Sequence, residues 1–457
     1  MTAAPEILLV SCYELGHEPL GLVVPAAVFA RAGIRVGLVD LAVEAFDETA
    51  FANARLVAIS VPMHTALRLG LRVAARVRAI TPDAHVCFYG LYAGLNRPHL
   101  VPGAADSCFG AEYETALLEL GRRILAAQQA PARAVRAPED ADPSARSPVR
   151  SIVQRPARDA IAHRAHYAHL ADGETRREVG YTQTTRGCKH TCRHCPLPPA
   201  YGGTFYALPP GDVLDDIAAL VERGASHITF ADPDFLNGPG HALRVARAMA
   251  ARFPGVTFDY TAKIEHLLHH ERVVDELHEI GCLFVVSALE SLNDTVLARL
   301  LKGHTRADAL AVARRFRARG LALRPSLVPF TPWENRASLA DLMDVVAGEG
   351  LVGNIDPVQY SIRLLLPERS LLLADESMAA CIEGFDPAMP GYRWRHPDPS
   401  MDALQRELAR LAEQTSRFRV PVEESFNRIR DLVAPGRDAV VPRAAGPSPR
   451  LTEDWFC

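Results

Sequence analysis

The sequence lacks the features that mark membrane proteins, nucleic-acid-binding proteins and disulfide-rich secreted proteins. None of its apolar runs approaches the roughly 18 residues that a membrane-spanning helix requires. Basic residues number 50 against 54 acidic ones, for a formal net charge of −4, whereas a protein that neutralises nucleic-acid phosphates needs a basic surplus. Nine cysteines among 457 residues are too few for a disulfide scaffold. We therefore expect a cytoplasmic protein whose partners include neither a membrane nor a nucleic acid.

Lysine is nearly absent, and a signal peptide is not recognised. Only Lys189, Lys263 and Lys302 are lysines, so that 50 minus three leaves 47 arginines. A GC-rich genome explains this bias, and against it each surviving lysine weakly suggests a specific need. The N-terminal sequence MTAAPEILLVSCYE has no basic residue ahead of its apolar stretch, which predicts a buried strand. The remaining composition, 48% hydrophobic and 23% charged, is that of an ordinary globular protein.

The N-terminal part of the chain alternates short apolar runs with helical patterns, as a parallel sheet covered by helices does. The predicted strands are EILLVSC, RVGLVDL, LVAISVP, HVCFYG and ADSCFG. Five strands in this rhythm predict an α/β, flavodoxin-like, doubly wound parallel sheet over residues 1–127. Such a domain binds its ligands at the carboxyl ends of the strands.

Residues 128–178 are predicted to form a linker, because Ala, Arg, Pro and Asp dominate the segment and apolar periodicity is missing. Within it, His163, His166 and His169 are spaced three residues apart. This spacing admits a metal site, but we favour a solvated basic helical turn.

Alternation resumes at Gly180. The predicted strands are GYTQTTR, HITFAD, TFDYTAK, CLFVVSAL, LRPSLVPF and DPVQYSIRLLL. Six βα units predict a partial (β/α)6 TIM-type barrel over residues 179–375, with its chemistry at the carboxyl ends of the strands. Short C-terminal helices over residues 376–433 and a flexible, proline-rich tail over 434–457 complete the predicted organisation.

The strongest chemical signal is TRGCKHTCRHCP at residues 185–196, directly after the first predicted barrel strand. The CxxxCxxC spacing places Cys188, Cys192 and Cys195 on one compact loop, and Gly187 permits a tight turn into it. A cubane iron–sulfur cluster is fully ligated by four cysteines. Three cysteines therefore leave one iron open to the amino and carboxylate groups of a small molecule.

The same loop allows one other metal centre. The three cysteines together with His190 or His194 could hold zinc. Zinc modules usually spread their ligand pairs over two knuckles, whereas here all three thiols share one loop and acidic residues end the next strand. We therefore favour the iron–sulfur cluster.

With this motif at this position, the chain resembles the radical S-adenosylmethionine (SAM) superfamily from about residue 180 to 370. The resemblance implies a [4Fe-4S] cluster whose open iron binds SAM, and an electron donor such as a flavodoxin or ferredoxin. His194 stands before the last cysteine, where the family usually has an aromatic residue near the adenine. Asp232 and Asp234, in FADPDF, stand where the family binds the SAM amino group, although this segment departs from the common Gly-Gly-Glu form.

Three further positions match the family at later strands. Lys263 ends the third predicted strand of the barrel. Ser287 and Glu290, in SALES at the end of the fourth, match positions that often contact the carboxylate or ribose of SAM. The SAM-binding residues that the resemblance implies are His194, Asp232, Asp234, Lys263, Ser287 and Glu290.

A flavodoxin-like domain joined to this barrel is similar to the cobalamin (B12)-binding branch of the superfamily. The loops that would hold the corrinoid are YELGHEPLG (13–21), SVPMHTALRLG (60–70) and YGLYAGLN (89–96). The Asp-x-His-x-x-Gly motif that supplies a cobalt ligand in other B12 proteins is absent, and His17 is expected to be a polar loop residue. Cobalamin binding and a vestigial B12-binding-like domain stay open as equal alternatives.

A narrower resemblance rests on HITFADPDFLNGP, CLFVVSALES, PFTPW and NIDPVQYSIRLLLP. Together they resemble the CUAEP/CCAEP-tail radical SAM (seleno)protein group, which is related to the radical SAM enzyme of arsinothricin biosynthesis. That enzyme joins the 3-amino-3-carboxypropyl part of SAM to trivalent arsenic. After a cysteine, the tail of this group continues through a second cysteine or a selenocysteine into Ala-Glu-Pro. We therefore expect an in-frame UGA, the selenocysteine codon, after the Cys457 codon, followed by an Ala-Glu-Pro-like sequence, and the Cys457 thiol is the candidate catalytic group.

These observations give one main functional hypothesis and two alternatives. The main hypothesis is a radical SAM transferase that moves a SAM-derived carbon fragment to a soft acceptor, arsenic or selenium, during the biosynthesis of a small molecule. The first alternative is cobalamin-dependent methylation of an unactivated carbon. The second belongs to another class, a non-catalytic metal or cobalamin sensor. A DNA-binding element would favour the sensor, and none is recognised in the sequence.

Overall fold

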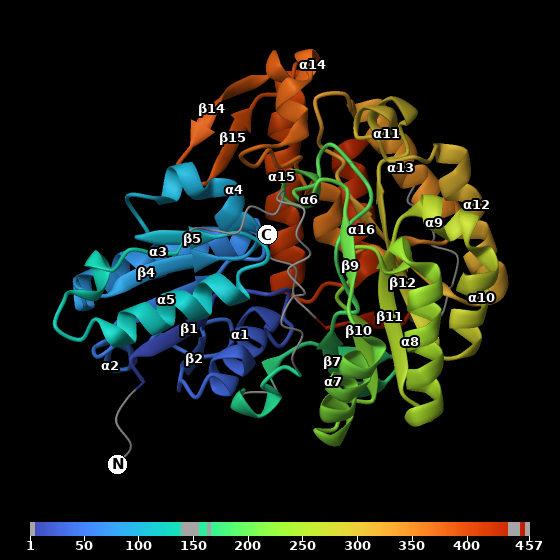
Figure 1. The fold of residues 1–457 in the computed structure, drawn as a ribbon. Coiled ribbons are helices and arrows are strands. Elements are labelled where there is room, and N and C mark those ends of the chain that lie inside the picture. The colour runs from blue at the N-terminus through green and yellow to red at the C-terminus, as the bar shows by residue number, and fades with distance from the viewer. Residues whose placement is uncertain (1–4, 139–154, 162–165, 437–447, 453–457) are drawn as a thin grey trace.

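A computed structural model describes residues 5–138, 155–161, 166–436 and 448–452 of the chain. Two α/β units lie side by side in Figure 1: a blue N-terminal unit, and a second unit whose colour runs from green through yellow to orange. Each unit is built on its own parallel sheet. The predicted fold class, a doubly wound sheet followed by a partial barrel, is confirmed.

The N-terminal unit has five parallel strands in the order β2-β1-β3-β4-β5. The strands are β1 (Ile7–Ser11), β2 (Gly37–Asp40), β3 (Leu56–Ser60), β4 (His85–Tyr89) and β5 (Ser107–Phe109). The helices are α1 (Leu20–Arg31), α2 (Glu48–Phe51), α3 (His64–Ile80), α4 (Leu91–Leu100) and α5 (Glu114–Ala126). Strands β1, β3 and β4 are buried along their whole length because helices cover both faces of the sheet, which explains their largely apolar sequences.

The second unit is a sheet in the order β13-β12-β11-β10-β7-β6-β16. Its parallel strands are β7 (Thr175–Thr182), β10 (His227–Phe230), β11 (Thr257–Ala262), β12 (Cys282–Glu290) and β13 (Ala322–Leu327). Two antiparallel strands, β6 (His169–Asp172) and β16 (Arg450–Leu451), extend the sheet beyond β7. The parallel strands bring their carboxyl ends to one edge, which we call the barrel edge.

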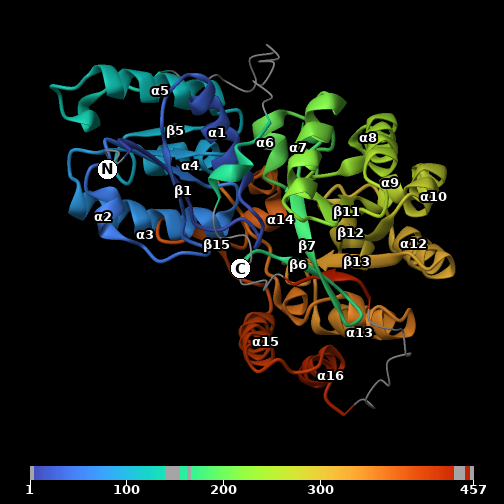
Figure 2. The same cartoon turned by 90° about the horizontal axis from the view of Figure 1, so that it is seen from below.

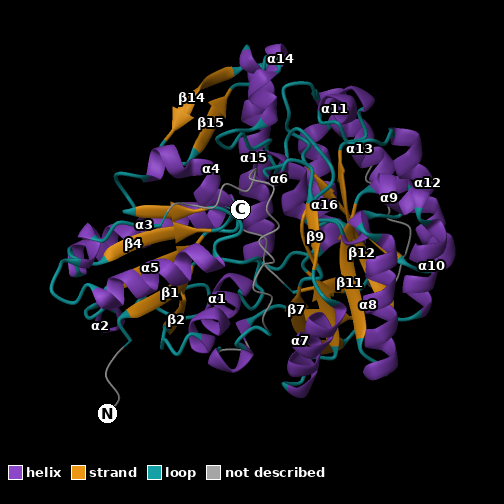
Figure 3. Ribbon diagram, viewed as in Figure 1, coloured by secondary structure: helices purple, strands orange, loops and turns teal. Residues whose placement is uncertain are grey.

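Helices cover the outer face of this sheet. They are α7 (Pro210–Glu222), α8 (Pro239–Arg252), α9 (Ile264–His269), α10 (Glu271–Glu279), α11 (Asp294–Arg299), α12 (Arg306–Arg319) and α13 (Arg336–Gly348). Figure 3 shows α8, α10 and α12 on the side of the strands that faces away from the N-terminal unit. Apart from α11, whose Val296 packs in a separate cluster with Met378 and Trp394, their apolar side chains and those of the strands form one continuous core.

The sixth predicted strand, over residues 356–366, is wrong. The segment forms the 3₁₀ helix η6 (Pro357–Ser361), followed by a single bridged pair of residues. Proline lacks the N–H group that a ladder strand donates. A side chain covers the edge instead, because the N–H of Leu327 donates to Oε1 of Gln359 at 2.9 Å. Within the described residues, the run of parallel strands therefore ends at β13.

The predicted C-terminal helices are present and follow a small hairpin. The elements are α14 (Glu376–Ala379), β14 (Ile382–Asp386), β15 (Gly391–Trp394), α15 (Pro399–Arg417) and α16 (Val422–Val433). Figure 2 shows α15 and α16 below α13, and apolar side chains of both helices join the barrel core. None of the helices in the described ranges combines the length and the apolarity of a membrane span.

Two segments with linker-like composition take part in the second sheet. Strand β6 lies within the predicted linker 128–178, and β16 lies within the predicted tail 434–457. His169 belongs to β6, so the predicted helical turn is wrong at this residue, whose ring contacts the carbonyl oxygen of Tyr167 at 2.8 Å. His163 lies outside the described residues.

Candidate functional site

The three cysteines of the CxxxCxxC motif lie on one loop at the barrel edge. A two-stranded hairpin, β8 (Thr185–Gly187) and β9 (Phe205–Ala207), flanks this cysteine loop, and α6 (Leu197–Tyr201) follows it. Gly187 has a φ of +80°, and a Cβ atom on it would lie 2.5 Å from the carbonyl oxygen of Thr204. The turn into the loop therefore needs glycine.

Burial disfavours the charged form of two of the three thiols, those of Cys188 and Cys195. Cys188 and Cys192 are buried, and Cys195 is half-buried. Burial raises the pKa of Cys195 to about 12 and also raises the pKa of Cys188, and the neighbouring thiols add to the rise at Cys195. Sulfurs crowded in this way become good thiolate ligands when a cation offsets their charge, which an iron–sulfur or zinc centre does.

Asp232, just after β10, forms hydrogen bonds with the residues that lead into the cysteine loop. Its carboxylate accepts hydrogen bonds from the N–H of Thr184 at 2.9 Å, from Oγ1 of Thr184 at 2.8 Å, and from the hydroxyl of Thr185. Burial raises the pKa of Asp232 to about 6 in spite of these bonds. The carboxylate is thus engaged within the chain, and its predicted contact with SAM stays a prediction.

Two histidines link Asp234 to Lys263 beside the cysteine loop. Nδ1 of His266 lies 2.9 Å from Oδ1 of Asp234, and Nε2 of His266 lies 2.9 Å from Nε2 of His190. Nδ1 of His190 in turn lies 3.2 Å from Nζ of Lys263. Because an ammonium only donates, His190 must donate from Nε2 to His266, which donates from Nδ1 to Asp234.

These hydrogen bonds fix the tautomers of both imidazoles. Burial, with the Lys263 ammonium and His266 beside it, lowers the pKa of His190 to about 4, in keeping with a neutral ring. The ligand atoms of His190, Asp234 and His266 lie within 4.8 Å of one another, close enough to hold a metal ion. The hydrogen bonds already satisfy these atoms, so the cluster is complete without a cation.

Glu290, at the end of β12, contacts two other residues at the barrel edge. Its Oε1 accepts from Nζ of Lys302 at 3.1 Å and from Nε2 of His194 at 3.3 Å. Burial alone would raise the pKa of Glu290, but the Lys302 ammonium and His194 hold it well below its usual range. Its φ of +66° is left-handed, a strained conformation that often marks functional sites. Nearby, Ser287 donates its hydroxyl to the carbonyl oxygen of Ala262 at 2.8 Å.

Some buried polar atoms near the cysteine loop have no hydrogen-bond partner among the described residues. They are Nδ1 of His194, Nδ2 of Asn237 and both ring nitrogens of His304. Asn237 accepts a weak hydrogen bond from the thiol of Cys188 at 3.6 Å, and His304 lies near the charge of Lys302 and makes a weak contact with the backbone of that residue. Buried polar groups without partners are rare. These atoms therefore indicate where a polar ligand would bind.

The structure brings four of the six predicted SAM-site residues together as two contacting pairs. The other two form hydrogen bonds elsewhere, Asp232 with threonines and Ser287 with a backbone carbonyl oxygen. The pairs are Asp234 with Lys263 and His194 with Glu290. Sequence reasoning missed His266, Lys302 and His304, although the scarcity of lysine pointed weakly to Lys302. Cys457 lies outside the described residues.

The loops predicted to hold a corrinoid lie at the carboxyl end of the N-terminal sheet. His17, in the first of them, is buried and stacks on Tyr181 of β7, with the ring centroids 4.1 Å apart. Burial lowers the pKa of His17 to about 3. The imidazole thus forms a contact between the two units.

Curated proteins and a family profile match the second unit. Residues 182–346 match the profile of the Radical SAM superfamily. A tRNA-2-methylthio-N(6)-dimethylallyladenosine synthase of Parafrankia sp. (strain EAN1pec) is 32% identical over 178 residues, 35% of this chain and 34% of that protein. The ribosomal protein uS12 methylthiotransferase RimO of Phocaeicola vulgatus is 22% identical over 197 residues, 40% of this chain and 45% of that protein. The chain thus spans less than half the length of these curated relatives.

Two solved structures resemble both units. The radical S-adenosylmethionine methyltransferase TsrM from Kitasatospora setae, with cobalamin and a [4Fe-4S] cluster bound, has a TM-score of 0.57 at 17% identity, covering 76% of this chain and 70% of that one. The cobalamin-dependent S-adenosylmethionine radical enzyme OxsB, with aqua-cobalamin and S-adenosylmethionine bound, has a TM-score of 0.68 at 12% identity, covering 90% of this chain and 67% of that one. At these identities the likeness concerns the fold alone. The narrower resemblance to the CUAEP/CCAEP-tail group stays a prediction.

Proposed function

We propose that this chain, whose residues 182–346 form a radical SAM domain, is an enzyme that binds a [4Fe-4S] cluster and SAM at the barrel edge. The observation that carries this proposal is the set of three thiols on one loop, beside buried polar atoms that lack partners. Cys188, Cys192 and Cys195 would hold three irons and leave the fourth for SAM. When bound, the cluster and SAM supply the one-electron cleavage of a carbon–sulfur bond.

The donor set favours the iron–sulfur cluster over the zinc alternative. His190 uses both of its ring nitrogens, one toward His266 and one toward Lys263. It therefore has no nitrogen left to complete a tetrahedral zinc site with the three cysteines. Nε2 of His194 is engaged by Glu290, so Nδ1 is the one nitrogen of His194 that remains for such a site.

The chain's own residues suit SAM at this place. The unpartnered ring nitrogens of His194 and His304 would pair with polar atoms of the adenosine part. Lys263 donates to Oε2 of Glu265 at 2.8 Å and carries a positive charge that would neutralise the carboxylate of SAM. The buried Lys302–Glu290 pair would hold the edge rigid and keep water out.

As the reaction, we propose the transfer of a SAM-derived carbon fragment to a soft acceptor, trivalent arsenic or selenium, in the biosynthesis of a small molecule. Support comes from the sequence resemblance and from the softness of a cysteine thiolate, which suits such acceptors. The hypothesis assigns that thiolate to Cys457. Strand β16 runs antiparallel to β6 and therefore in the direction of β7, toward the barrel edge. A cytoplasmic flavodoxin or ferredoxin would supply the electron.

Cobalamin-dependent methylation of an unactivated carbon is the second candidate function. The observation in its favour is the joint likeness of both units to the folds of TsrM and OxsB. It requires a corrinoid at the carboxyl edge of the N-terminal sheet, which the main hypothesis does not.

The nucleoside left after turnover distinguishes the two reactions. Transfer of the 3-amino-3-carboxypropyl group breaks one carbon–sulfur bond of SAM and leaves 5′-methylthioadenosine. Methylation of an unactivated carbon leaves S-adenosylhomocysteine from the SAM that donates the methyl group, and 5′-deoxyadenosine from a second SAM whose radical removes the hydrogen atom. Chromatography of the products formed by anaerobically reconstituted protein with a reductant, with and without arsenite, therefore tests the proposed reaction. Formation of S-adenosylhomocysteine as the main product would contradict it.

Measurement of iron and acid-labile sulfide in the same reconstituted protein tests the metal centre. We expect about four irons and four sulfides per chain, and Cys188→Ala should abolish both the cluster and the cleavage of SAM. Cys381→Ala is the matched control, because this half-buried thiol lies in the C-terminal part outside the cysteine loop. Stoichiometric zinc without labile sulfide, after anaerobic purification, would contradict the proposal.

A further inference from the structure

The carboxyl edge of the N-terminal sheet is where a doubly wound fold binds its ligand. In the order β2-β1-β3-β4-β5, the winding reverses between β1 and β3, and the crevice outside that switch point is the usual binding place. The residues that follow β1, begin α1 and follow β3 therefore decide whether this crevice is open. All of these residues belong to the described part of the chain.

Glu14 fills the crevice at the N-terminus of α1. Its Oε1 accepts a hydrogen bond from the N–H of Leu20 at 3.1 Å, and its Oε2 accepts one from Gly21 at 3.3 Å. Glu14 is buried, with 7% of its surface exposed. These N–H groups are the ones that a helix N-terminus offers to an anionic ligand. A carboxylate of the chain itself already holds them.

Close packing fills the remaining space between the strands. A Cβ atom on Gly21 would clash with Oγ of Ser60, at the end of β3. Tyr89, at the end of β4, donates its hydroxyl to the carbonyl oxygen of Gly21 at 2.6 Å. A cavity between α1 and α7 measures about 30 Å³, enough for one or two water molecules and far too small for a corrinoid. A larger groove, of about 650 Å³, is lined by His64 of the loop 60–70 and otherwise by residues 363–406, and it contains no residue of the loops 13–21 and 89–96.

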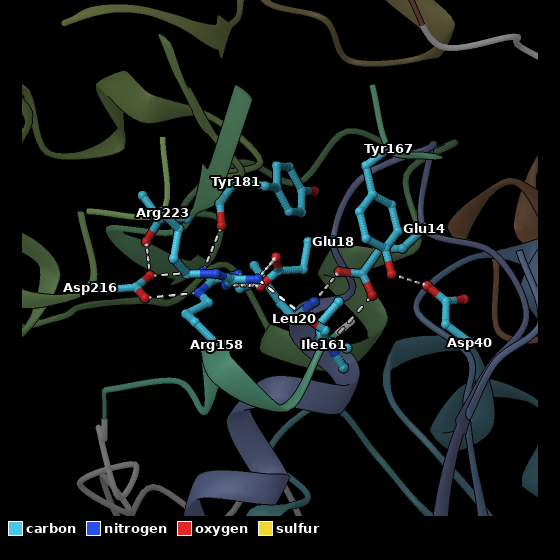
Figure 4. Close-up of polar contacts among 12 residues, drawn as sticks. Glu14, Glu18, Leu20, Asp40, Arg158, Ile161, Tyr167, Tyr181, Asp216 and Arg223 are labelled. Carbon is cyan, nitrogen blue, oxygen red and sulfur yellow. Dashed lines mark hydrogen bonds and ion pairs between the residues drawn. The ribbon is translucent and has the colours of Figure 1, made fainter. Parts of the chain in front are cut away.

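A second segment covers the edge from outside. We call residues 156–161 and 166–169 the strap. Backbone N–H groups of the strap donate to carbonyl oxygens of α1 and of the loop after β1, at 2.9 and 2.7 Å. Tyr167 packs into the core of the N-terminal unit and donates its hydroxyl to Oδ2 of Asp40 at 2.7 Å (Figure 4). The strap therefore covers the carboxyl ends of β1 and β2.

Arg158 of the strap joins the two units, as Figure 4 shows. Its side chain is 1% exposed. The guanidinium donates to both carboxylate oxygens of Asp216 in α7, at 2.9 and 2.8 Å, to Oε1 of Glu18 at 2.9 Å, and to the carbonyl oxygen of Tyr181 at 2.7 Å. Arg223 also donates to Glu18, at 3.2 Å. Two arginines and two carboxylates thus form a buried, balanced network across the interface.

The N-terminal unit also contacts both ends of the cysteine loop. Arg186, two residues before the first cysteine, pairs with Glu114 at 2.6 Å and with Glu112 at 3.3 Å. Tyr201, at the end of α6, donates its hydroxyl to Oε1 of Glu112 at 2.9 Å. Both carboxylates stand at or just before the start of α5. Two glutamates of the N-terminal unit therefore hold the loop that carries the metal ligands.

We propose that the N-terminal unit binds no corrinoid and instead positions the cysteine loop. Glu14 and the strap occupy the crevice in which a corrinoid would lie, and Glu112 and Glu114 act as positioning residues for the loop. The residues present do not fit the cofactor that the likeness in fold implies. The positioning role rests on the proposed cluster, whereas the closed crevice stands independently of it.

The crevice is tested with the full-length protein. Reconstituted protein is mixed with hydroxocobalamin and desalted, and iron, sulfide and the visible corrinoid bands are measured on the same sample. We expect a full cluster and no retained corrinoid. Retention of one corrinoid per chain would overturn the closed crevice. A sample that forms no cluster would contradict the proposed function, while its corrinoid bands would still decide the state of the crevice.

The positioning role is tested by the double variant Glu112→Gln, Glu114→Gln. Residues that orient metal ligands typically change metal affinity by about 10- to 100-fold, so iron loss to a chelator should be roughly tenfold faster and the EPR spectrum of the reduced cluster should shift. Glu119→Gln is the matched control, since this exposed residue of α5 pairs with Arg123 on the same helix and with no other cation of the described residues. If the double variant does not fold, Tyr201→Phe, which removes one hydroxyl, decides in its place. Wild-type iron loss and an unchanged EPR spectrum in a folded variant would overturn the role.

Discussion

The two units present the same structural feature, the carboxyl edge of a parallel sheet, and use it in opposite ways. At the switch point of the N-terminal sheet, Glu14 and Tyr89 hydrogen-bond to the start of α1. At the barrel edge, by contrast, His194, Asn237 and His304 keep buried polar atoms without partners in the described structure. Buried polar groups that lack partners cost stability, and a ligand that pairs with them recovers that cost.

A likeness in fold does not decide what the carboxyl edge of either sheet binds. The likeness to TsrM and OxsB covers both units, but function depends on the residues at each edge and not on the fold. The carboxyl edge of the N-terminal sheet is an interface within the chain, whereas the barrel edge has the character of a binding site. Substitutions at the N-terminal edge should therefore lower the unfolding free energy, whereas substitutions at the barrel edge should weaken ligand binding without lowering it.

The largest effect is expected at the interface, from Arg158→Met. Loss of the guanidinium leaves Glu18 and Asp216 as buried carboxylates without their main partner, and breaking a buried ion pair in this way costs about 3–5 kcal/mol. Denaturant unfolding of the full chain measures the loss. Arg155→Met is the control, because this exposed residue lies 3.9 Å from Glu222 and should change little. An equally small change in both variants would mean that the strap does not hold the two units together.

A smaller effect, dependent on pH, is expected from Glu14→Gln. Burial raises the pKa of Glu14 from 4.5 to about 7, so the folded protein binds this proton more tightly than the unfolded chain. The stabilising contribution is therefore complete below pH 4.5 and is lost as the pH rises to 7.

Between pH 5 and pH 8 the wild-type protein should lose about 2–3 kcal/mol of unfolding free energy through Glu14. Glu14→Gln should not show this part of the loss, whereas the exposed control Glu119→Gln should show all of it. Denaturant unfolding at the two pH values provides the comparison. Parallel pH profiles for wild type and Glu14→Gln would place this carboxylate in water rather than in a closed crevice.

Much of the fold and the metal-binding loop could be predicted because their signals are local. The strands of both sheets are short apolar runs, and the three cysteines lie within eight residues of one another. The failure at residues 356–366 is also local in origin. The segment has the apolar content of a strand, but it begins at Pro357, and tertiary contacts of Gln359 settle it as a 3₁₀ helix.

The polar networks could not be predicted, because their members are distant in sequence. His190 and His266 are 76 positions apart, and Arg158 is 140 positions from Glu18. Arg158 also lies in a segment rich in Ala, Arg and Pro, whose composition is that of a linker. Composition describes the average of such a segment, whereas a single buried guanidinium depends on what the fold places around it.

An effect of the opposite kind is expected at the barrel edge, from His304→Phe. Among the described residues, the buried ring nitrogens of His304 make no close hydrogen bond and only a weak contact with the backbone of Lys302, so their removal should leave the stability of the free protein unchanged or raise it by about 1 kcal/mol. SAM binding should weaken roughly tenfold, or about 1.4 kcal/mol. Calorimetric titration with SAM and denaturant unfolding measure the two quantities. His278→Phe is the control for SAM affinity, because among the described residues the ring nitrogens of His278 contact the carbonyl oxygens of Cys282 and Arg319. Unchanged SAM affinity in His304→Phe would remove this residue from the site.

The smallest effect concerns β16, which joins the C-terminal part of the chain to the second sheet. Thr452 donates its N–H to the carbonyl oxygen of His169 at 2.8 Å, and the N–H of His169 donates to Oγ1 of Thr452 at 2.9 Å. A hydrogen bond contributes about 1 kcal/mol net, so Thr452→Val should speed hydrogen exchange at the His169 amide about fivefold. Global unfolding should not change, because a local opening of β16 leaves both cores intact. Thr175→Val is the control in the same hairpin, since its hydroxyl donates to Asp172 and not to β16. An unchanged exchange rate at the His169 amide in the Thr452→Val variant would show that β16 does not protect the edge strand β6 in solution. The edge of β6 would then be open to another strand.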